Sequence, residues 1–479
     1  MQLPNDYLGN ARTRLRMTRT TGSATPTRPP PSQNGTSAHG RRAGVVHVDI
    51  NTIDLNAQFL QASDLIERQG HSLFITGKAG TGKSTLLHYL HSTTTKETVV
   101  LAPTGVAALN VGGQTIHSFF QFPPTRIDPQ AIRRRRNTKL FQKLELLIID
   151  EVSMVRADVM DGIDTALRLY RNNLQTPFGG VQVVLCGDLF QLPPIVRDAE
   201  LQTFFTEHYG GPYFFLAQVF AGLRPYVLDL TTIYRQQDTA FIRILNKIRE
   251  HDLDAELFSL LNQRVVRTNV MPHGGSFITL TTTNGAALRT NQARLAQIRA
   301  PLHTYSASVT GSFDPSSYPT EQELELKRGA QIMLIKNDAE KRWVNGTLGT
   351  ISVLTEQKIC VAIAGTSYEV EPETWQNIQY HYHRESNRIE EEVIGTFTQY
   401  PLRLAWAITI HKSQGQTFDK VLIDLGRGAF AHGQTYVALS RCRSLEGIVF
   451  SRPVTPRDIL FDERIHGFTR VFQPVPRVM

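Results

Sequence analysis

The 479-residue sequence has little cysteine and lacks a long apolar run. Its three cysteines, Cys186, Cys360 and Cys442, are odd in number and far apart. That pattern excludes a disulfide framework and a cysteine-based zinc site, and it suits a reducing compartment. No stretch reaches the roughly 18 consecutive apolar residues of a membrane-spanning helix, so no membrane association is expected. With 41% hydrophobic and 20% charged residues, wholesale disorder is excluded as well.

Charge of one sign is also scarce once the first 43 residues are set aside. The formal net charge is +8, but residues 1–43 contain seven arginines and one aspartate, which leaves +2 for the rest of the chain. Because this segment is rich in Thr, Arg, Pro, Ser and Gly without apolar periodicity, residues 1–45 are predicted to form a disordered basic tail. An organellar transit peptide and a non-specific contact for phosphate are alternatives for this tail.

From residue 51 onward, apolar runs alternate with helical segments. Continuous apolar runs that end on small, polar or acidic residues are typical of strands buried on both faces of a parallel sheet. The sequence therefore predicts an α/β fold with two parallel-sheet domains, the first over residues 46–230 and the second over 231–330 and 395–479. Shorter strands separated by turns predict a small inserted β-barrel over residues 331–394.

The most specific local pattern is residues 77–84, GKAGTGKS, which follow a strand-like run and open an apolar helix. The glycines allow backbone N–H groups to surround phosphate oxygens, and the helix N-terminus adds the positive end of its dipole. Lys83 is expected to reach the β- and γ-phosphates of a nucleotide, and Ser84 to hold Mg²⁺. A plain glycine-rich turn is the alternative. The residues expected to bind the nucleotide here are Gly80, Thr81, Gly82, Lys83, Ser84 and Thr85.

A nucleotide site of this kind needs an acidic partner at the end of a neighbouring strand. The apolar run of residues 146–149 is followed by Asp150 and Glu151. Asp150 is expected to bind the metal, and Glu151 to polarise the attacking water in hydrolysis. A helix cap at a strand end is the alternative for such a pair. Its combination with residues 77–84 favours an NTPase.

Three further residues are candidates for the phosphate end of the same site. Gln191 follows a predicted strand and precedes two stiffening prolines, so its amide is suited to sensing the γ-phosphate. Arg235 and Arg441 lie in the second domain. A cleft between the domains would let both guanidinium groups stabilise a transferring γ-phosphoryl group. A tight turn at Gln191 and solvated surface arginines are the alternatives.

In their order and spacing, these motifs resemble those of the Pif family, the superfamily-one helicases that move 5′ to 3′ on DNA. The resemblance extends from about residue 55 to residue 468, and short spacers make the chain more similar to bacterial members than to long eukaryotic ones. The segments that carry it are residues 77–84, 102–108, 113–119, 150–154, 178–180, 187–194, 234–236, 283–284, 406–417 and 436–441.

The resemblance implies two RecA-like domains flanking an ATP cleft, with a small wedge insertion at about 121–140 in the first and the barrel in the second. It implies an ATP-dependent DNA helicase with ATP and Mg²⁺ as cofactors, acting on single-stranded, forked or structured DNA, including G-quadruplexes and RNA–DNA hybrids. Family roles in DNA repair, replication, recombination and telomere maintenance are implied too. Gly415 carries over as an ATP contact. The residues that carry over as DNA contacts are Thr104, Gly105, His117, Phe119, Thr283, Asn284, His411, Lys412 and Ser413.

Aromatic and basic residues near these motifs extend the expected DNA path. Phe119, Phe120 and Trp406 are candidate stacking platforms, worth roughly 1–3 kcal/mol per base if exposed, with burial in the core as the alternative. Four consecutive arginines at residues 133–136 lie in the wedge segment and are candidates for strand separation or for a solvated surface.

One position departs from the family pattern. The family's adenine-reading glutamine is expected near position 60, where Leu60 stands. We expect Gln58 to take that role after a local shift, with Gln61 or backbone groups as alternatives.

Two other functions remain open on the sequence. A RecD-like motor subunit of a larger DNA-processing complex has overlapping motifs, and a P-loop scaffold that binds nucleic acid without turnover would need only part of them. The complete set of Lys83, Asp150, Glu151, Gln191, Arg235 and Arg441 argues against the scaffold. We expect a monomer in a bacterial cytoplasm, associated with the nucleoid, with organellar import as the alternative. No protein partner is predicted.

Overall fold

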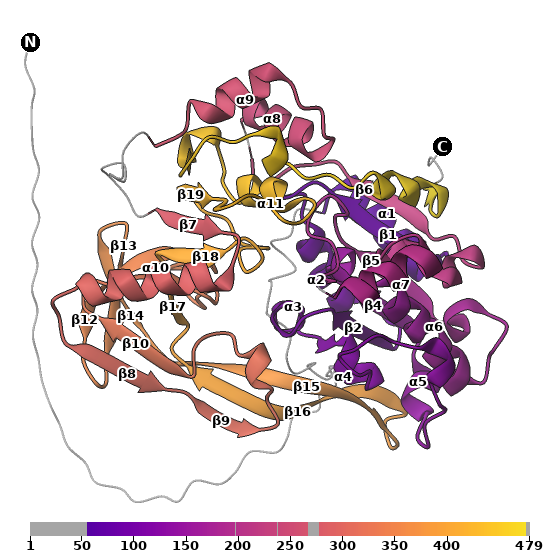
Figure 1. Cartoon of the computed structure of the whole chain (residues 1–479). Helices are drawn as coiled ribbons and strands as arrows, with labels where there is room; N and C mark the ends of the chain where they lie inside the picture. Colours follow the sequence, from indigo (N-terminus) through magenta and orange to yellow (C-terminus); the bar gives the residue numbers. More distant parts are fainter. Residues whose placement is uncertain (1–54, 197, 237, 267–276, 476–479) are drawn as a thin grey trace, which may run out of the picture. The chain divides into compact units, whose positions relative to one another are not determined.

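Two parallel β-sheets organise the part of the chain that the computed structural model describes, residues 55–196, 198–236, 238–266 and 277–475 (Figure 1). The predicted basic tail of residues 1–45 lies outside the described residues. The first sheet contains β1 (Leu73–Gly77), β2 (Thr98–Ala102), β3 (Gln114–Thr115), β4 (Leu146–Ile149), β5 (Gln182–Cys186), β6 (Tyr226–Leu230) and β21 (Gln473–Pro474). Their order is β21-β6-β1-β5-β4-β2-β3, and all these neighbours are parallel.

Helices bury both faces of the first sheet, which explains the continuous apolar runs. Within β2, Val99 and Leu101 pack in one core cluster with α6, whereas Val100 packs in another with α1 and α2. Alternate residues of a strand face opposite sides of the sheet, so both sides need apolar residues. The helices of this domain are α1 (Ala57–Glu67), α2 (Lys83–Thr93), α3 (Gly105–Val111), α4 (Ile116–Phe120), α5 (Lys139–Lys143), α6 (Ala157–Arg171) and α7 (Ala199–Tyr209).

The second parallel sheet has the order β18-β7-β19-β20. Its strands are β7 (Ile278–Thr281), β18 (Ala407–Thr409), β19 (Val421–Asp424) and β20 (Ile448–Phe450). The accompanying helices are α8 (Thr239–Arg249), α9 (Ala255–Asn262), α10 (Asn284–Gln297) and α11 (Gln434–Ser440). In α8, Phe241, Ile244 and Ile248 recur at helical spacing and enter the core of this domain. The predicted α/β fold with two parallel-sheet domains is confirmed.

The region inserted into the second domain is antiparallel. A five-stranded sheet of order β14-β13-β12-β11-β17 contains β11 (Gln331–Leu334), β12 (Leu348–Leu354), β13 (Ile359–Ile363), β14 (Thr366–Val370) and β17 (Leu402–Leu404). The long hairpin of β15 (Glu373–His383) and β16 (Arg388–Gln399) pairs with β9 (Ser308–Gly311), and β8 (Leu302–Ser306) pairs with β10 (Glu323–Lys327).

The predicted limits of this insertion, residues 331–394, are wrong. Its strands begin with β8 at Leu302 and end with β17 at Leu404, because these outer strands pair with inserted strands and not with the second parallel sheet. The apolar run of residues 402–410 does not form one strand, because β17 pairs with β11 and β18 pairs with β7.

The β15–β16 hairpin contacts the first domain (Figure 1). The Val100 backbone N–H donates to the Tyr380 hydroxyl at 3.3 Å, and the Ile389 N–H donates to the Glu97 carboxylate at 2.8 Å. Ile378 and Tyr380 are both buried in the first-domain core. The inserted region is therefore anchored at its hairpin as well as at its two chain connections.

The C-terminal end of the described chain returns to the first domain. β21 pairs in parallel with β6, and the Phe472 ring lies 4.8 Å from the Phe74 ring between centroids. Ile465 is fully buried in the same core cluster. The assignment of all residues 395–479 to the second domain is therefore wrong.

We predict that Phe472→Ala destabilises the first domain by about 3–5 kcal/mol, the usual cost of removing a buried phenylalanine. Phe472 is 4% exposed, whereas Phe430 is 59% exposed and provides the matched control Phe430→Ala. Urea unfolding followed by circular dichroism measures both variants. Equal stabilities of the two variants would contradict the docking of this segment.

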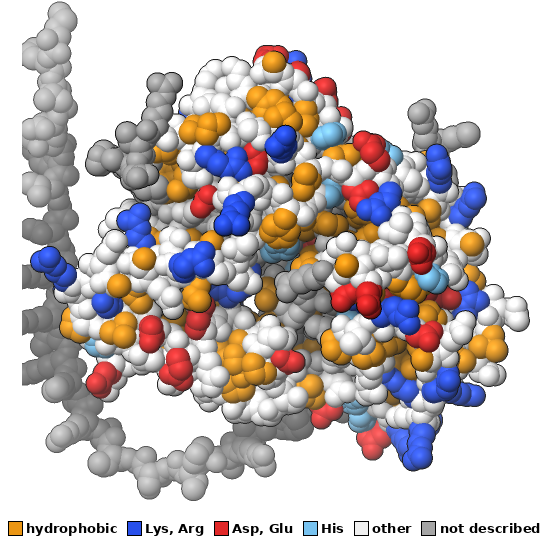
Figure 2. Space-filling model, in the orientation of Figure 1, with side chains coloured by type: hydrophobic (Ala, Val, Ile, Leu, Met, Phe, Trp, Pro, Cys, Tyr) orange, Lys and Arg blue, Asp and Glu red, His pale blue; other side chains and the backbone are white. Residues whose placement is uncertain are grey.

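The surface carries both signs of charge. On the face drawn in Figure 2, Lys and Arg side chains are interspersed with Asp and Glu, as the near balance of charge outside residues 1–43 leads one to expect. Within the described residues, no helix is both long and apolar enough to cross a membrane. Bulk charge therefore identifies no binding surface, and the site has to be found from local geometry.

Candidate functional site

The loop between β1 and α2 is shaped by glycines at positions that side chains would block. Gly80 and Gly82 have φ of +83° and +85°, in the left-handed region. A Cβ at Gly80 would lie 2.5 Å from the Cβ of Arg235. The loop can therefore form only with glycine here, and it lies directly against an arginine of the second domain.

Lys83 is turned into this loop. Its ammonium donates to the carbonyl of Gly77 at 2.7 Å and to that of Lys78 at 3.1 Å. The Thr81 hydroxyl also donates to the Lys78 carbonyl, at 2.9 Å. Ser84 and Thr85 are exposed in the first turn of α2. The ammonium is held by neutral carbonyls of the loop, and a phosphate anion bound there would be a stronger partner.

Two carboxylates follow β4 at the same edge of the sheet. Asp150 is 8% exposed, and Glu151 has φ of +47°, which is unusual for a residue with a side chain. Burial raises the pKa of Asp150, and nearby Lys83 opposes that rise. Burial and then the charge of Asp150 raise the pKa of Glu151, while Lys83 and Arg441 oppose that rise. Two carboxyl groups beside a lysine, one buried and one half-buried, suit metal binding and base chemistry.

Gln191 does not reach the loop between β1 and α2 through a hydrogen bond. Its side-chain amide donates to the Asp188 carboxylate at 3.1 Å, and only 7% of the residue is exposed. Asp188 itself is buried and lies in the turn that follows β5. The predicted role of Gln191 as a γ-phosphate sensor stays a prediction, and it requires a local rearrangement of this turn.

The second domain supplies two arginines. Arg235 Nη1 donates to the Ser440 carbonyl at 3.2 Å. Arg441 is 1% exposed, and its Nε donates to the Val437 carbonyl at 3.0 Å. Burial, and then the positive charge of Arg235, lower the pKa of Arg441 to about 9, which keeps the guanidinium charged near neutral pH. Both cations are thus held by neutral groups of their own domain, and Arg441 is close enough to Glu151 to lower the pKa of that carboxyl group.

Gln58, the predicted adenine-reading residue, is bonded to the backbone of β6 and of the segment that follows it. The Gln58 amide donates to the Asp229 carbonyl at 2.6 Å, and its oxygen accepts from the Thr231 N–H at 2.9 Å. Phe59 and Tyr234 lie beside Gly82, with Phe59 Cζ 3.2 Å from where a Cβ would be. Gln58 as the adenine-reading residue therefore stays a prediction.

Gly415, the other predicted ATP contact, is exposed with φ of +78°. No heavy atom outside its immediate chain neighbours lies within 4 Å of where its Cβ would be. The space beside its backbone is therefore open.

Two predicted DNA contacts of the first domain line one cavity of about 170 Å³. Thr104, His117 and Arg156 contribute polar side chains, and the remaining lining residues are Pro103, Ile116, Met154, Val155, Val159 and Ile195. Burial and then Arg156 lower the pKa of His117, so its imidazole is neutral near pH 7. Gly105 is packed against Ser317, whose Oγ would lie 2.1 Å from a Cβ.

Predicted DNA contacts of the second domain differ in exposure. Thr283, Asn284 and Lys412 are exposed, and Thr283 caps α10 by accepting from the Ala286 N–H at 3.3 Å. The His411 ring stacks on Phe430 with centroids 6.1 Å apart and planes 13° apart. The exposed side chains of Thr283, Asn284 and Lys412 are available to a ligand.

Two predicted DNA contacts have buried side chains in this structure, and their roles stay predictions. Phe119 is 5% exposed and packs against Phe120 and Phe141, because α4 is short and its apolar side faces the core. Ser413 is fully buried, and its hydroxyl donates to the Ile410 carbonyl at 2.7 Å. Phe120 is buried and Trp406 half-buried against the inserted sheet, so none of the three predicted aromatic platforms is exposed.

The predicted wedge at 121–140 is an irregular segment packed on α6. The buried Ile127 donates its N–H to Asp158 at 2.8 Å. Arg135 lies over the Phe141 ring at 5.4 Å, while Arg133, Arg134 and Arg136 are exposed. Strand separation by these arginines stays a prediction.

Comparison with known proteins places this geometry in a family. The family model described as PIF1-like helicase matches residues 56–256, and the one described as DNA helicase Pif1, 2B domain, matches residues 315–354. The ATP-dependent DNA helicase Pif1 of Bdellovibrio bacteriovorus is 31% identical over 446 residues, which cover 91% of this chain and 95% of that protein. The chain belongs to the PIF1-like helicase family. The predicted resemblance, including its bacterial character, is confirmed.

Other members of the PIF1-like helicase family give the same result. The rat ATP-dependent DNA helicase PIF1 is 35% identical over 398 residues, covering 79% of this chain, which spans 58% of the rat protein's length. The structure of Bacteroides sp Pif1 in complex with ADP-AlF4 has a TM-score of 0.81 and 39% identity, covering 87% of this chain and 97% of that one. Bacteroides Pif1 bound to ssDNA has a TM-score of 0.62 and the same coverage.

Four residues near this PIF1-like site were missed by sequence reasoning. Tyr436 accepts a hydrogen bond from the Ala79 N–H of the nucleotide loop at 3.1 Å, Arg249 pairs with Asp188, and Phe430 is exposed beside His411. Tyr436 and Asp188 lie within the motif segments 436–441 and 187–194, so the sequence could have indicated them as site residues. Arg249 and Phe430 have no local pattern that separates them from other arginines and phenylalanines.

Proposed function

We propose that this chain is an ATP-driven DNA helicase that translocates 5′ to 3′ on single-stranded DNA. The observation that carries the proposal is the convergence of groups from two sheets. Lys83, Asp150 and Glu151 lie at one edge of the first sheet, and Arg441 of the second domain is near enough to affect the pKa of Glu151. Such a site binds a phosphate chain between two domains, so hydrolysis can be coupled to their movement.

The residues divide the work of hydrolysis as follows. Lys83 leaves its loop carbonyls to bind the β- and γ-phosphates, and Glu151 accepts a proton from the attacking water. Arg235 and Arg441 exchange their carbonyl partners for the γ-phosphoryl oxygens, whose charge they stabilise. After the γ-phosphate is lost, both arginines bond again to the carbonyl groups of their own domain. The cleft between the domains then reopens.

The donor set suits Mg²⁺ that arrives with ATP. The described residues contain no group of three or more His, Cys, Asp and Glu side chains that could hold a metal. The Ser84 hydroxyl and the Asp150 carboxylate are hard oxygen donors, too few for an octahedral ion without phosphate oxygens and water. When bound, the ion would neutralise charge on the phosphates.

The proposed DNA path follows the helix N-termini and exposed polar groups of both domains. Thr104 and Thr283 are N-caps of α3 and α10, the type of position where backbone N–H groups bind phosphate. His117, Asn284, His411 and Lys412 extend the path. Family resemblance adds forked and structured DNA as substrates, with RNA–DNA hybrids as a further class.

We predict that Phe430→Ala weakens binding of single-stranded DNA by about 1–3 kcal/mol, because an exposed ring beside His411 offers a base a stacking surface. Phe430 is 59% exposed, and Leu174, 58% exposed on the first domain, gives the control Leu174→Ala. Fluorescence anisotropy with labelled oligothymidine measures the affinity. An unchanged affinity for Phe430→Ala would remove this residue from the path.

A RecD-like motor subunit is the second candidate, favoured by the same motifs, and stable co-purification with further subunits would support it. A scaffold without turnover is a third. We propose a monomer that works in a bacterial cytoplasm near the nucleoid and has no contact with membranes.

Measurement of ATPase rate with and without single-stranded DNA tests the proposal. We expect DNA to stimulate turnover in the wild type and no turnover in Lys83→Ala, which lacks the ammonium expected to bind the β- and γ-phosphates. A wild-type ATPase rate that is the same with and without DNA would contradict a DNA motor. DNA-stimulated ATP turnover without duplex unwinding would favour the RecD-like subunit.

A further inference from the structure

Arg249, the last residue of α8, links the second domain to the turn after β5. Its Nη2 lies 3.5 Å from Asp188 Oδ1, and its guanidinium carbon lies 3.8 Å from the centre of the Phe190 ring. Its side chain is only 10% exposed. A charged side chain is buried at such cost only when its partners compensate, and here both partners belong to one turn of the other domain.

That turn is organised around the Asp188 carboxylate. The Asp188 side chain is wholly buried. Its Oδ1 accepts from the Phe190 N–H at 3.2 Å, and its Oδ2 accepts from the Gln191 side-chain amide at 3.1 Å. The carboxylate that holds Gln191 is therefore also the carboxylate that faces Arg249.

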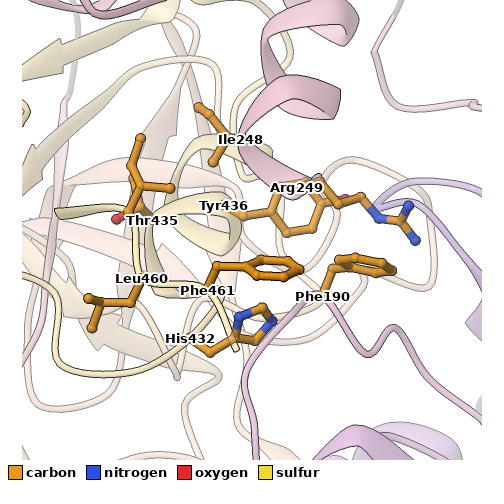
Figure 3. Close-up of a pocket in the computed structure, with 10 residues that line it drawn as sticks. Phe190, Ile248, Arg249, His432, Thr435, Tyr436, Leu460 and Phe461 are labelled. Carbon is orange, nitrogen blue, oxygen red and sulfur yellow. The ribbon is translucent and has the colours of Figure 1, made fainter. Parts of the chain in front are cut away.

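Figure 3 shows Arg249 extended above the Phe190 ring, with the Tyr436 ring beside it and His432 and Phe461 below. Tyr436 accepts from the Ala79 N–H at 3.1 Å, so the same cluster touches the nucleotide loop. Ala79 and Leu192 of the first domain are buried in the apolar core of the second. A displacement of α8 or α11 therefore acts on both segments.

The distance between the Arg249 guanidinium and the Asp188 carboxylate is longer than that of an optimal ion pair. Charge-assisted N–H···O bonds are usually about 2.7–2.9 Å long, whereas this one is 3.5 Å. Arg249 Nε, although buried, has no hydrogen-bond acceptor among the described residues. A small approach of α8 toward the turn would shorten the pair and pull the Asp188 carboxylate.

We propose that Arg249 is a positioning residue: through Asp188 it sets the orientation of Gln191, so that movement of the second domain brings the Gln191 amide to the phosphate end of the site. The inference rests on the proposed ATP-driven function. It differs from the roles of Arg235 and Arg441, because Arg249 acts on the glutamine turn and does not itself contact the nucleotide.

A purely structural ion pair would give a different result. Loss of such a pair lowers the stability of the domain contact without changing turnover in the protein that remains folded. A positioning role changes kcat at saturating ATP and DNA while the KM for ATP and the Kd for DNA stay near wild type. The split between kcat and these two constants distinguishes the roles.

The experiment uses the full chain with Arg249→Gln, Arg249→Lys and the control Arg243→Ala, which removes an exposed arginine of the same helix. We expect Arg249→Gln to lower the DNA-stimulated kcat on the order of 10²-fold, the effect of a misplaced active-site group. Arg249→Lys keeps the charge opposite Asp188 but loses the planar stack on Phe190, so we expect partial activity. Arg243→Ala should match wild type.

A double-mutant cycle with Asp188→Asn completes the test. If Arg249 acts through Asp188, the double variant should be no slower than the more severe single variant. Multiplied effects, or wild-type kcat in folded Arg249→Gln and Arg249→Lys, would overturn the positioning role. These outcomes are separable from failure of the proposed function, because that failure appears first as a wild-type ATPase without DNA stimulation.

Discussion

Replacing Glu151 with glutamine is expected to nearly abolish ATP hydrolysis while ATP still binds. Gln has the shape of Glu but cannot accept a proton, so the attacking water loses its base; loss of a general base costs about 10²–10⁴-fold in rate. Glu151 occupies a half-buried position beside Lys83, Asp150 and Arg441 that suits this role. Single-turnover phosphate release with saturating single-stranded DNA measures the rate, and a fluorescent ATP analogue measures binding.

Glu145 supplies the matched control. It is exposed, immediately precedes the other end of β4, and accepts a hydrogen bond from the Glu97 N–H at 2.8 Å. Glu145→Gln should hydrolyse ATP at the wild-type rate. Turnover close to wild type in Glu151→Gln would refute the assignment of Glu151 as the base.

Arg441→Ala is expected to reduce kcat by about 10³-fold, the contribution of an arginine that stabilises the transferring phosphoryl group. DNA affinity should be retained, because the Arg441 side chain is buried and bonded to carbonyls of its own domain, so it is not exposed to DNA. Stopped-flow ATPase assays and DNA anisotropy on the same preparation measure both quantities.

Two further variants test whether a loss of activity in Arg441→Ala comes from misfolding of the protein. Arg441→Lys keeps a cation in the buried site but loses the planar fork, so it should fold and remain slow. Arg443→Ala removes an exposed arginine two residues away and should behave as wild type. If folded Arg441 variants lose DNA affinity and keep kcat, the arginine lies on the DNA path and the cleft placement fails.

The fold class was predictable because its determinants are local. The strands β1, β2, β4 and β5 are continuous apolar runs, and a run buried on both faces can hardly be anything but a central parallel strand. The nucleotide loop was predictable for a similar reason: the glycines at 80 and 82 meet a requirement for positive φ that the sequence itself displays.

What failed depends on contacts between distant parts of the chain. Nothing within residues 465–474 reveals that they return to β6, since a two-residue strand such as β21 has no periodicity to read. The division of residues 402–410 is decided by two partners, β11 and β7, that compete for one apolar run. Phe119 and Ser413 were chosen by motif, and a motif does not specify which side of a short helix or turn faces the core.

Arg249 and Phe430 are candidate functional residues that the sequence did not indicate, again because distant contacts decide their surroundings. An arginine that ends an amphipathic helix is usually solvated, and only the approach of the Asp188 turn makes it a buried partner. An isolated phenylalanine is usually buried. Only the three-dimensional structure shows that Phe430 is exposed and lies beside His411. Tertiary contacts, not composition or spacing, give these residues their roles.

Unwinding of two duplexes that differ only in the polarity of a single-stranded tail tests the central claim most directly. With ATP and Mg²⁺, we predict strand separation of the duplex with a 5′ tail, none of the duplex with a 3′ tail, and none of either with Glu151→Gln. Unwinding from the 3′ tail, or from neither tail despite DNA-stimulated hydrolysis, would contradict a 5′-to-3′ helicase.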